Sequence, residues 1–424
     1  MTSAPQFPVL VNQIAGHAIP DLAQQFGTPL YVYDAAVIVE RIRELAAFDV
    51  VRYAQKACSN LAILDLVRRH RVLVDAVSAG EIRRALVAGY RPDRGEHPEI
   101  MFTADLFDAE TLDLVVEHNI PVNCGSPDMI DQLGERAPGR GITLRINPGF
   151  GHGHSQKTNT GGEGSKHGIW LTQIADCAKR AAKYEIKITG LHMHIGSGTD
   201  MEHLGNVCQA MEQAAREVGD SLQAISAGGG LPTPYREGDE RVDLAAYFAL
   251  WDATRKRLAH ELGHPLTLEL EPGRYLVAES GSLIAEIRAI KQMGSKCYYL
   301  VDAGFNNLAR PILYGAYHPI AIGRKDGTTT SSAFQPVVVG GPLCESGDIF
   351  TQEAGGFVST RELPAAEVGD YLVIGCAGAY GAVMGSNYNS KPLAAEVLLD
   401  GGQAHLVRKR QSFEDLISGE VIPR

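Results

Sequence analysis

The feature that most restricts the fold of this 424-residue chain is a regular alternation of strand-like and helix-like segments. Segments with helical spacing, such as 59–69 and 244–262, separate eight apolar, strand-like segments: 50–56, 72–77, 100–103, 121–123, 142–147, 188–194, 224–227 and 266–270. Eight strands alternating with helices over about 220 residues are what a parallel (β/α)8 barrel needs. An open doubly wound sheet remains an alternative, because periodicity indicates the number of strands better than their closure.

The alternation stops after Gly273. Strand-like segments then recur without helices between them, at 282–291, 297–301, 337–339, 371–374 and 396–399. Clusters of Gly, Pro and Asp separate these segments, which is typical of an antiparallel β-domain. We therefore predict an α/β + β chain, with a TIM-type barrel at 36–277 and an antiparallel β-sandwich or Greek-key domain formed by 1–35 and 278–424.

Composition excludes several classes of protein. A formal net charge of -11 and the lack of a Lys/Arg-rich run argue against nucleic-acid binding. No apolar run reaches the ~18 residues of a membrane span, and residues 1–10 do not resemble a signal peptide. Seven scattered cysteines without a C-x-x-C pair indicate reduced thiols. We expect a cytoplasmic protein with no membrane partner.

Unusual polar residues and glycines follow the predicted barrel strands, where barrel enzymes carry their chemistry. They are Lys56 at the end of the first strand, Arg145 and Asn147 at the fifth, His192 and His194 at the sixth, Gly228, Gly229 and Gly230 after the seventh, and Glu271 and Arg274 after the eighth. Each has an ordinary structural explanation as well. The lysine could reach solvent from a strand edge, the glycines could form a tight turn, and Glu271 with Arg274 could be an ion pair at the rim.

Taken together, these residues indicate a cofactor site. A lysine placed at the end of a buried strand loses basicity and can attack a carbonyl. Three consecutive glycines expose backbone N–H groups to a phosphate, and Arg274 can bind the same group. Glu271 could hold a pyridinium nitrogen, and one imidazole of the sixth strand could stack on the ring. This combination describes pyridoxal phosphate.

The pair His192 and His194 also permits a metal site, because alternate residues of a strand point to the same side. Metal-binding barrels, however, usually carry such a pair on the first strand, with further histidines on later ones. No other predicted barrel strand here ends in a histidine. We therefore predict no metal, and two purely structural histidines remain a further alternative.

Several motifs identify a family resemblance that runs from about residue 28 to 396. The chain resembles the group IV pyridoxal-phosphate decarboxylases with an alanine-racemase-type barrel. The segments that carry this resemblance are 53–57 (YAQKA), 192–197 (HMHIGS), 228–230 (GGG) and 271–274 (EPGR). In the second domain, 341–348 (GPLCESGD) and 378–381 (GAYG) are similar to the diaminopimelate decarboxylases. The chain departs from the family after Lys56, where Ala57-Cys58-Ser59-Asn60 replaces the common Ala-Asn.

The resemblance implies roles for individual residues. Lys56 would carry the cofactor as a Schiff base, His194 would stack on its ring, and Glu271 would pair with the ring nitrogen. Cys344 would protonate the substrate carbon after loss of CO2, arriving with Glu345 from the second subunit of a homodimer with shared active sites. The phosphate end and its surroundings would be held by Ser197, Gly228, Gly229, Gly230, Arg274 and Tyr380, with Asp75 and Glu81 behind the lysine and histidine.

Physical reasoning extends this to the substrate. Meso-diaminopimelate carries an ammonium and a carboxylate at its non-reacting end, so a selective site needs charges of both signs there. Arg310 and Arg274 supply positive charge, Glu345 supplies negative charge, and we add Tyr314 and Tyr380 to the predicted substrate site. Arg310 could instead form a surface ion pair. We expect decarboxylation of meso-2,6-diaminopimelate to L-lysine and CO2, the last step of lysine biosynthesis.

Two alternatives remain open. Another decarboxylase of the same fold, acting on arginine, ornithine or carboxynorspermidine, would need only the anion at the far end. A non-catalytic carrier of pyridoxal phosphate is the alternative from a different class, and such carriers usually lack the β-domain with its Cys344-Glu345 segment.

Overall fold

Strand pairing closes eight parallel strands into a barrel, as predicted. The computed structural model describes residues 6–92, 97–151, 160–194, 200–329 and 333–423. Each barrel strand pairs in parallel with the next, and the eighth returns to the first through Glu269 opposite Val50 and Leu270 opposite Val51. The barrel strands are β4 (Val50–Ala54), β5 (Leu73–Ala76), β6 (Ile100–Ala104), β7 (Val122–Cys124), β8 (Gly141–Asn147), β10 (Lys187–His192), β11 (Ala224–Ser226) and β12 (Thr267–Leu270).

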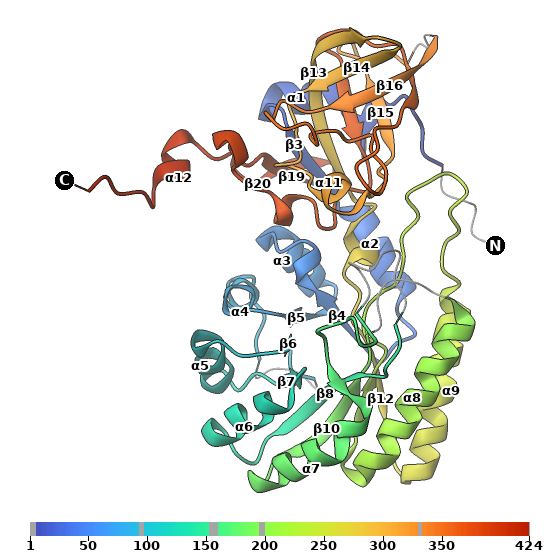
Figure 1. Ribbon diagram of the computed structural model, residues 1–424, viewed down its shortest axis with the longest axis vertical. Coiled ribbons are helices and arrows are strands. Elements are labelled where there is room, and N and C mark those ends of the chain that lie inside the picture. The colour runs from blue at the N-terminus through green and yellow to red at the C-terminus, as the bar shows by residue number, and fades with distance from the viewer. Residues whose placement is uncertain (1–5, 93–96, 152–159, 195–199, 330–332, 424) are drawn as a thin grey trace. The chain divides into compact units, whose positions relative to one another are not determined.

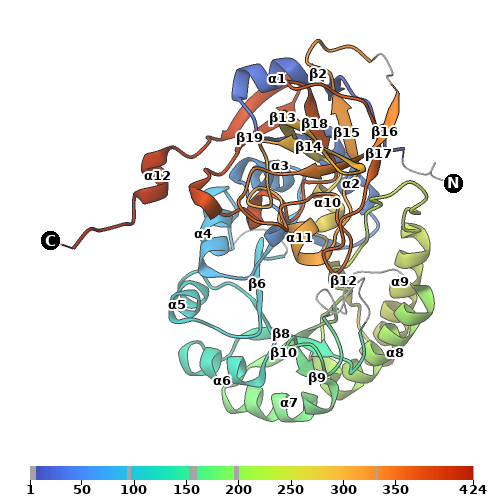
Figure 2. The ribbon, with the colours of Figure 1, turned by 45° about the horizontal axis from the view of Figure 1, so that its top comes forward.

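Helices surround the barrel strands on the outside (Figure 2). Most of them follow a capping residue, whose side chain accepts a hydrogen bond from a backbone N–H of the first turn. These capping residues are Asn60 for α3, Ser78 for α4, Asp108 for α5, Asp200 for α8 and Asp243 for α9. Such caps satisfy N–H groups that have no partner within the helix. The helices are α3 (Leu61–Arg69), α4 (Ala79–Val87), α5 (Ala109–Glu117), α6 (Pro127–Arg136), α7 (Ile174–Lys183), α8 (Met201–Val218) and α9 (Leu244–Leu262).

The chain separates into two compact units. The barrel unit contains residues 39–232 and 242–275, and the β unit contains 1–38, 233–241 and 276–424. Sequence analysis placed 233–241 in the barrel domain, whereas these residues pack in the β unit. Helices α2 (Ala35–Glu44) and α10 (Arg274–Val277) each extend from one unit into the other along the chain.

The β unit is built around one long strand, β13 (Gly281–Met293), which pairs antiparallel with β3 (Leu30–Asp34), β14 (Lys296–Val301) and β18 (Tyr371–Ile374). Figure 1 shows β3, β13 and β14 in the upper part of the view. Two pairings are parallel, β14 with β16 and β3 with β19. The sequence predicted an antiparallel domain, so the unit differs from that prediction in these two pairings. Its remaining elements are β1 (Gln13–Ile14), β2 (His17–Ala18), α1 (Ile19–Phe26), α11 (Arg310–Tyr314), β15 (Ile320–Gly323), β16 (Phe334–Gly340), β17 (Arg361–Pro364), β19 (Ala395–Asp400), β20 (Gln403–Arg408) and α12 (Phe413–Ile417).

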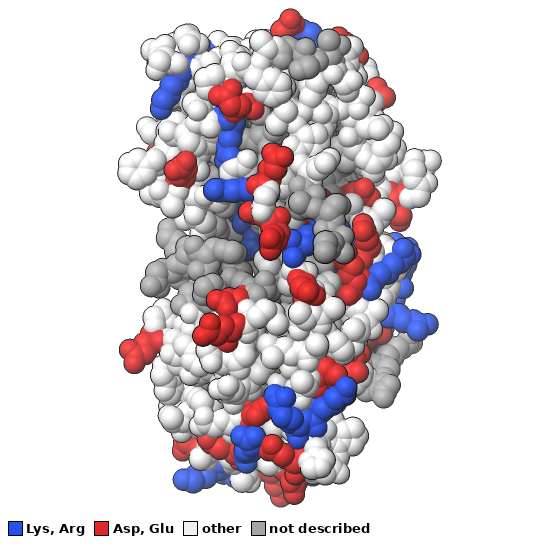
Figure 3. Space-filling view, turned by 90° about the vertical axis from the view of Figure 1, so that its right-hand side faces the viewer, with Lys and Arg blue, Asp and Glu red and all other residues white. Residues whose placement is uncertain are grey.

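The surface carries charges of both signs. On the face drawn in Figure 3, acidic and basic side chains are interspersed, and the basic ones do not gather into one continuous patch. Among the described residues, no helix is both long and apolar enough to cross a membrane.

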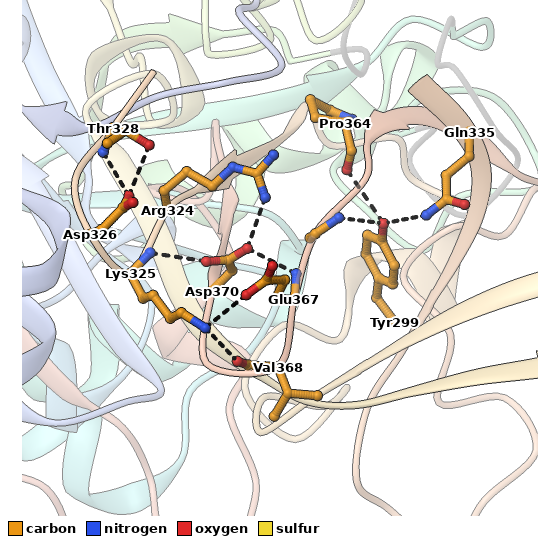
Figure 4. A network of polar contacts seen from close by, with 11 residues as sticks. Tyr299, Arg324, Lys325, Asp326, Thr328, Gln335, Pro364, Glu367, Val368 and Asp370 are labelled. Carbon is orange, nitrogen blue, oxygen red and sulfur yellow. Dashed lines mark hydrogen bonds and ion pairs between the residues drawn. The ribbon is translucent and has the colours of Figure 1, made fainter. Parts of the chain in front are cut away.

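A buried carboxylate organises the turn between β17 and β18. Asp370 is 2% exposed and accepts hydrogen bonds from Arg324 Nη1 (2.9 Å), the backbone of Lys325 (3.0 Å) and the backbone of Glu367 (2.9 Å), as Figure 4 shows. The neighbouring ion pair of Lys325 with Glu367, at 2.9 Å, is instead exposed to solvent. Only the buried carboxylate is therefore expected to matter for stability.

Replacing Asp370 tests this difference. Asp370→Ala leaves the Arg324 guanidinium and two backbone donors without the carboxylate, so we expect a loss of about 3 kcal/mol in the free energy of unfolding. Glu367→Ala, which removes only the exposed ion pair, should change it by less than about 0.5 kcal/mol. Urea unfolding followed by fluorescence measures both, and equal effects would refute the assignment.

Candidate active site

The sequence predicted that Lys56 ends the first barrel strand, but the structure places it after the strand. Strand β4 ends at Ala54, and Lys56 lies in the 3-10 turn Gln55–Ala57, where its side chain is exposed. Its neighbours Gln55 and Ala57 are completely buried, and the Gln55 amide donates to the backbone oxygen of Glu81 at 3.1 Å. The turn is therefore fixed by its buried neighbours, while the amine remains accessible for covalent chemistry.

Two carboxyl groups lie within the electrostatic range of that amine. Burial raises the pKa of Asp75 well above its usual range, and the charge of Glu271 raises it further, against opposing effects of Thr103 and Lys56. Burial also raises the pKa of Glu81, although the backbone N–H of Val77 and the Lys56 ammonium oppose this. The charge of Lys56 thus acts on both acids, which is consistent with their predicted place behind the lysine.

Glu271 and His192 form a buried pair beneath the C-terminal ends of the strands. His192 Nε2 lies 2.8 Å from Glu271 Oε2, and the Ser226 hydroxyl donates to Oε1 at 3.1 Å. Burial alone would raise the pKa of Glu271, but His192, Arg52 and Ser226 outweigh it and lower the pKa to about 2. Glu271 is thus an ionised carboxylate at neutral pH, as a partner of a pyridinium nitrogen must be.

His194 differs from His192 in its surroundings. It lies two residues beyond the end of β10, and its buried Nδ1 has no hydrogen-bond partner among the described residues. Burial lowers the pKa of His194 well below its usual range, and the charges of Arg145 and Lys56 lower it further. The ring is a neutral imidazole, which suits stacking on an aromatic cofactor.

Gly228 and Gly229 leave no room for side chains. A Cβ on Gly228 would lie 2.4 Å from the backbone oxygen of Met193, and its φ of +65° also favours glycine. A Cβ on Gly229 would lie 2.7 Å from the backbone oxygen of Glu271 and 3.5 Å from His194 Cε1. The backbone of this turn therefore runs directly beside His194 and Glu271, which fits a close approach to a bound phosphate.

Sequence reasoning missed Asp105, which helps to hold the described residues 160–168 of the loop that follows β8. Asp105, just after β6, accepts from the backbone of Gly168 at 3.0 Å and lies 2.5 Å from His167 Nδ1. Asn147 donates to the backbone oxygens of Gly162 and His167, and Thr160 donates to the backbone oxygen of His194 at 2.8 Å. Asp105 directly follows β6, one of the predicted barrel strands, and this position could have identified it as a candidate site residue.

In the β unit, Cys344 is exposed on a turn that a buried acid shapes. Asp348 accepts from the backbone N–H groups of Phe305 (2.7 Å) and Leu343 (2.8 Å), and Asn389 accepts from the backbone of Cys344 at 2.8 Å. The neighbouring Glu345 is also exposed. The turn thus presents a thiol and a carboxylate side by side in sequence, while Asp348, which sequence reasoning gave no role, holds its backbone.

Arg310 and Tyr380 occupy defined positions in the same unit. Arg310 is the first residue of α11 and is 7% exposed, so the alternative of a surface ion pair is wrong. Tyr380 has a φ of +56°, a backbone conformation that non-glycine residues rarely adopt, and is half-buried. Tyr314, at the end of α11, is likewise half-buried.

The barrel unit therefore gathers most of its predicted residues. The charges of Lys56 and Glu271 act on His194, and Gly228 and Gly229 pack against His194 and Glu271. Arg274, half-buried, begins the short α10 directly after this cluster, whereas Ser197 lies outside the described residues. Among the described residues, no three His, Cys, Asp or Glu side chains are grouped as metal ligands.

An accessible lysine, an ionised buried carboxylate, a neutral imidazole and a glycine turn fit pyridoxal phosphate. Together with the closed barrel and the β unit, they define a pyridoxal-phosphate enzyme of the barrel type. Consistent with this, the model of the family "Pyridoxal-dependent decarboxylase, pyridoxal binding domain" matches residues 36–278.

Relatives match nearly the whole chain. The diaminopimelate decarboxylase of Escherichia coli K12 is 56% identical over 95% of this chain and 96% of its own length, and that of Streptomyces coelicolor is 52% identical over 99% and 96%. A crystal structure of a diaminopimelate decarboxylase superposes with a TM-score of 0.92 at 55% identity, covering 94% of this chain and 95% of that one. The enzyme of M. jannaschii in co-complex with L-lysine gives 0.85 at 30% identity, covering 97% and 96%.

The chain therefore belongs to the pyridoxal-dependent decarboxylases, and among them to the diaminopimelate decarboxylases.

The His192–Glu271 pair generates a pH-dependent prediction. His192→Leu leaves the buried Glu271 carboxylate without its hydrogen-bonding partner at 2.8 Å, so we expect about 3–5 kcal/mol less stability at pH 7. The depressed pKa of Glu271 gives the wild type stability that is lost as pH falls from about 4.5 toward about 2. In the variant the pKa of Glu271 rises, so the difference from the wild type should shrink between pH 7 and pH 4.

Urea unfolding at both pH values measures that difference. The exposed His70 provides the control, since His70→Leu should change stability by less than about 0.5 kcal/mol at either pH. A His192→Leu effect that is the same at pH 7 and pH 4 would contradict the ionised state of Glu271.

The glycine turn gives a second prediction. Gly229→Ala pushes a methyl group against the Glu271 backbone, so we expect affinity for pyridoxal phosphate to fall at least about tenfold. Gly205→Ala on α8 meets no atom within 4 Å and should leave the affinity unchanged. Fluorescence titration of apoenzyme with the cofactor measures both, and unchanged binding by Gly229→Ala would remove this turn from the cofactor site.

Proposed function

We propose that this chain decarboxylates meso-2,6-diaminopimelate to L-lysine and CO2, the final step of lysine biosynthesis, in the cytoplasm. The observation that carries the proposal is 50–56% identity, over nearly the full length, to diaminopimelate decarboxylases of several bacteria. As a member of that group the chain is a carboxy-lyase, and its cofactor is pyridoxal phosphate.

The barrel residues have complementary roles toward the cofactor. When bound, pyridoxal phosphate withdraws the electrons that decarboxylation leaves on the substrate carbon. We assign its covalent attachment to Lys56, its ring face to His194 and its ring nitrogen to Glu271. Because Glu271 is held ionised, it would keep a proton on that nitrogen. We assign the cofactor's phosphate to Ser197, Gly228, Gly229, Gly230 and Arg274, with Tyr380 nearby.

We assign a second role to the Lys56 amine after the substrate displaces it from the cofactor. Once displaced, the accessible Lys56 amine would accept a proton from the incoming substrate amine and would return to the cofactor when the product leaves.

We assign the second proton transfer to Cys344. Its thiol would give a proton to the substrate carbon from which CO2 has left. The turn that carries it is fixed by Asp348, and the side chain is exposed, as a group that acts on a second copy of the chain must be. We therefore propose a homodimer in which each subunit supplies Cys344 and Glu345 to its partner.

Charge at the far end of the substrate decides between this reaction and its alternatives. Arg310 and Arg274 would bind the distal carboxylate, Glu345 the distal ammonium, and Tyr314 and Tyr380 would line the same region. Arginine and ornithine lack that carboxylate, so a buried Arg310 favours diaminopimelate over them. The retained cysteine turn favours an enzyme over a non-catalytic carrier.

The direct test is CO2 release from the purified holoenzyme given meso-diaminopimelate, the L,L isomer, arginine or ornithine. We expect release from the meso isomer and at least about 100-fold less from the other three. Cys344→Ala should lower kcat at least about 100-fold with cofactor content unchanged, and Cys376→Ala, a buried cysteine of the same unit, serves as its control. Preferred turnover of arginine or ornithine would overturn the assignment.

A further inference from the structure

Two side chains without an assigned role, those of His318 and Tyr235, hold the guanidinium of Arg310. Its Nη1 lies 2.9 Å from His318 Nε2, and its Cζ lies 4.9 Å from the centre of the Tyr235 ring. His318 is 3% exposed, and its ring meets that of Tyr235 edge to face, with centroids 5.4 Å apart. Arg310 is thus fixed both in the plane of its guanidinium and across its face.

The protonation of His318 follows from its contacts. Its Nδ1 lies 3.0 Å from the backbone oxygen of Gly375, which can only accept a hydrogen bond. Nδ1 must therefore carry a proton, and Nε2 accepts a hydrogen bond from Arg310 Nη1. A neutral histidine in this tautomer takes one of the five N–H donors of the guanidinium and determines which edge faces away.

Tyr235 belongs to a short segment, 233–241, that follows the glycine turn along the chain and packs in the β unit. The backbone N–H groups of Tyr235 and Arg236 both donate to Asp239 Oδ2 at 2.8 Å, which forms a tight turn. At its end, Arg241 makes two hydrogen bonds to Glu279, at 2.7 and 3.0 Å. The segment is therefore anchored at both ends.

The neighbours of Tyr235 and His318 form a second stack beside the first. Arg236 and Arg361 both lie over the Tyr317 ring, at 4.6 and 3.4 Å from its centre. The consecutive pairs Tyr235–Arg236 and Tyr317–His318 thus interlock, with one residue of each pair in each stack. Cation–π contacts of this kind favour a defined geometry, which stiffens the support of Arg310.

We infer that Tyr235 and His318 are positioning residues, which hold Arg310 so that it recognises the carboxylate at the far end of an amino-acid substrate. The inference rests on the proposed function and deepens it. It assigns the selectivity for a substrate with a carboxylate at its non-reacting end to Arg310, Tyr235 and His318. Arginine pairs with a carboxylate through two parallel bonds, so a rotated guanidinium loses much of that binding.

The test compares two ligands that differ only in the recognised group. Decarboxylation of one end of diaminopimelate leaves L-lysine, which keeps the far carboxylate, whereas cadaverine lacks it. Calorimetry of the holoenzyme gives the Kd of each ligand without requiring turnover. We expect Tyr235→Leu and His318→Leu to weaken L-lysine binding at least about tenfold and cadaverine binding less than about twofold.

Conservative variants separate positioning from general damage. Tyr235→Phe keeps the ring, and His318→Gln keeps an acceptor for Arg310 and a donor for Gly375, so both should bind L-lysine nearly as the wild type does. KM for meso-diaminopimelate should rise in the two leucine variants, with kcat changed less.

The outcomes distinguish this inference from the proposed function. Weakened binding of both ligands to the same degree, or of neither, would overturn the positioning role. A wild type that binds L-lysine no better than cadaverine would overturn it too. A wild type that prefers L-lysine but releases no CO2 from meso-diaminopimelate would instead refute the proposed function and leave the positioning role standing.

Discussion

The contact of His192 with Glu271 is the interaction on which the chemistry of the barrel depends. Two buried carboxyl groups, Asp75 and Glu271, share the C-terminal side of the strands and oppose each other's ionisation. The histidine resolves this competition, because it stabilises the charge of Glu271 only. One acid is thereby held as a carboxylate, as a pyridinium nitrogen requires, while the other remains sensitive to the state of Lys56.

The β unit carries the polar groups that we propose to meet the substrate. Asp348 fixes the backbone around Cys344, and Tyr235 with His318 holds Arg310. In both cases a buried group shapes the residue that we propose to meet the substrate. The reactive side chains themselves are few, and most of the polar contacts serve to orient them.

Much of this arrangement could be predicted from the sequence. Strand periodicity gave the barrel, and residues at strand ends gave the lysine, the glycine turn and Glu271, because the ends of parallel strands converge. Periodicity could not show that the chain turns before Lys56, which leaves the side chain exposed rather than buried at a strand end. Nor could it separate His192 from His194, since their difference lies in the contact of His192 with Glu271 and in the charges of Arg145 and Lys56 near His194.

The β unit was harder to predict for a related reason. Short strands such as β15 and β17 carry little periodic signal, and parallel pairing of β3 with β19 joins residues far apart in sequence. The support of Arg310 likewise comes from Tyr235, which the sequence places after a barrel strand.

The most direct test of the whole account is to locate the cofactor on the chain. Borohydride reduction of the holoenzyme, followed by peptide mass spectrometry, identifies the lysine to which pyridoxal phosphate is bound. The account predicts the added mass on Lys56 alone, at close to one per chain. A modified lysine elsewhere, or none at all, would contradict it.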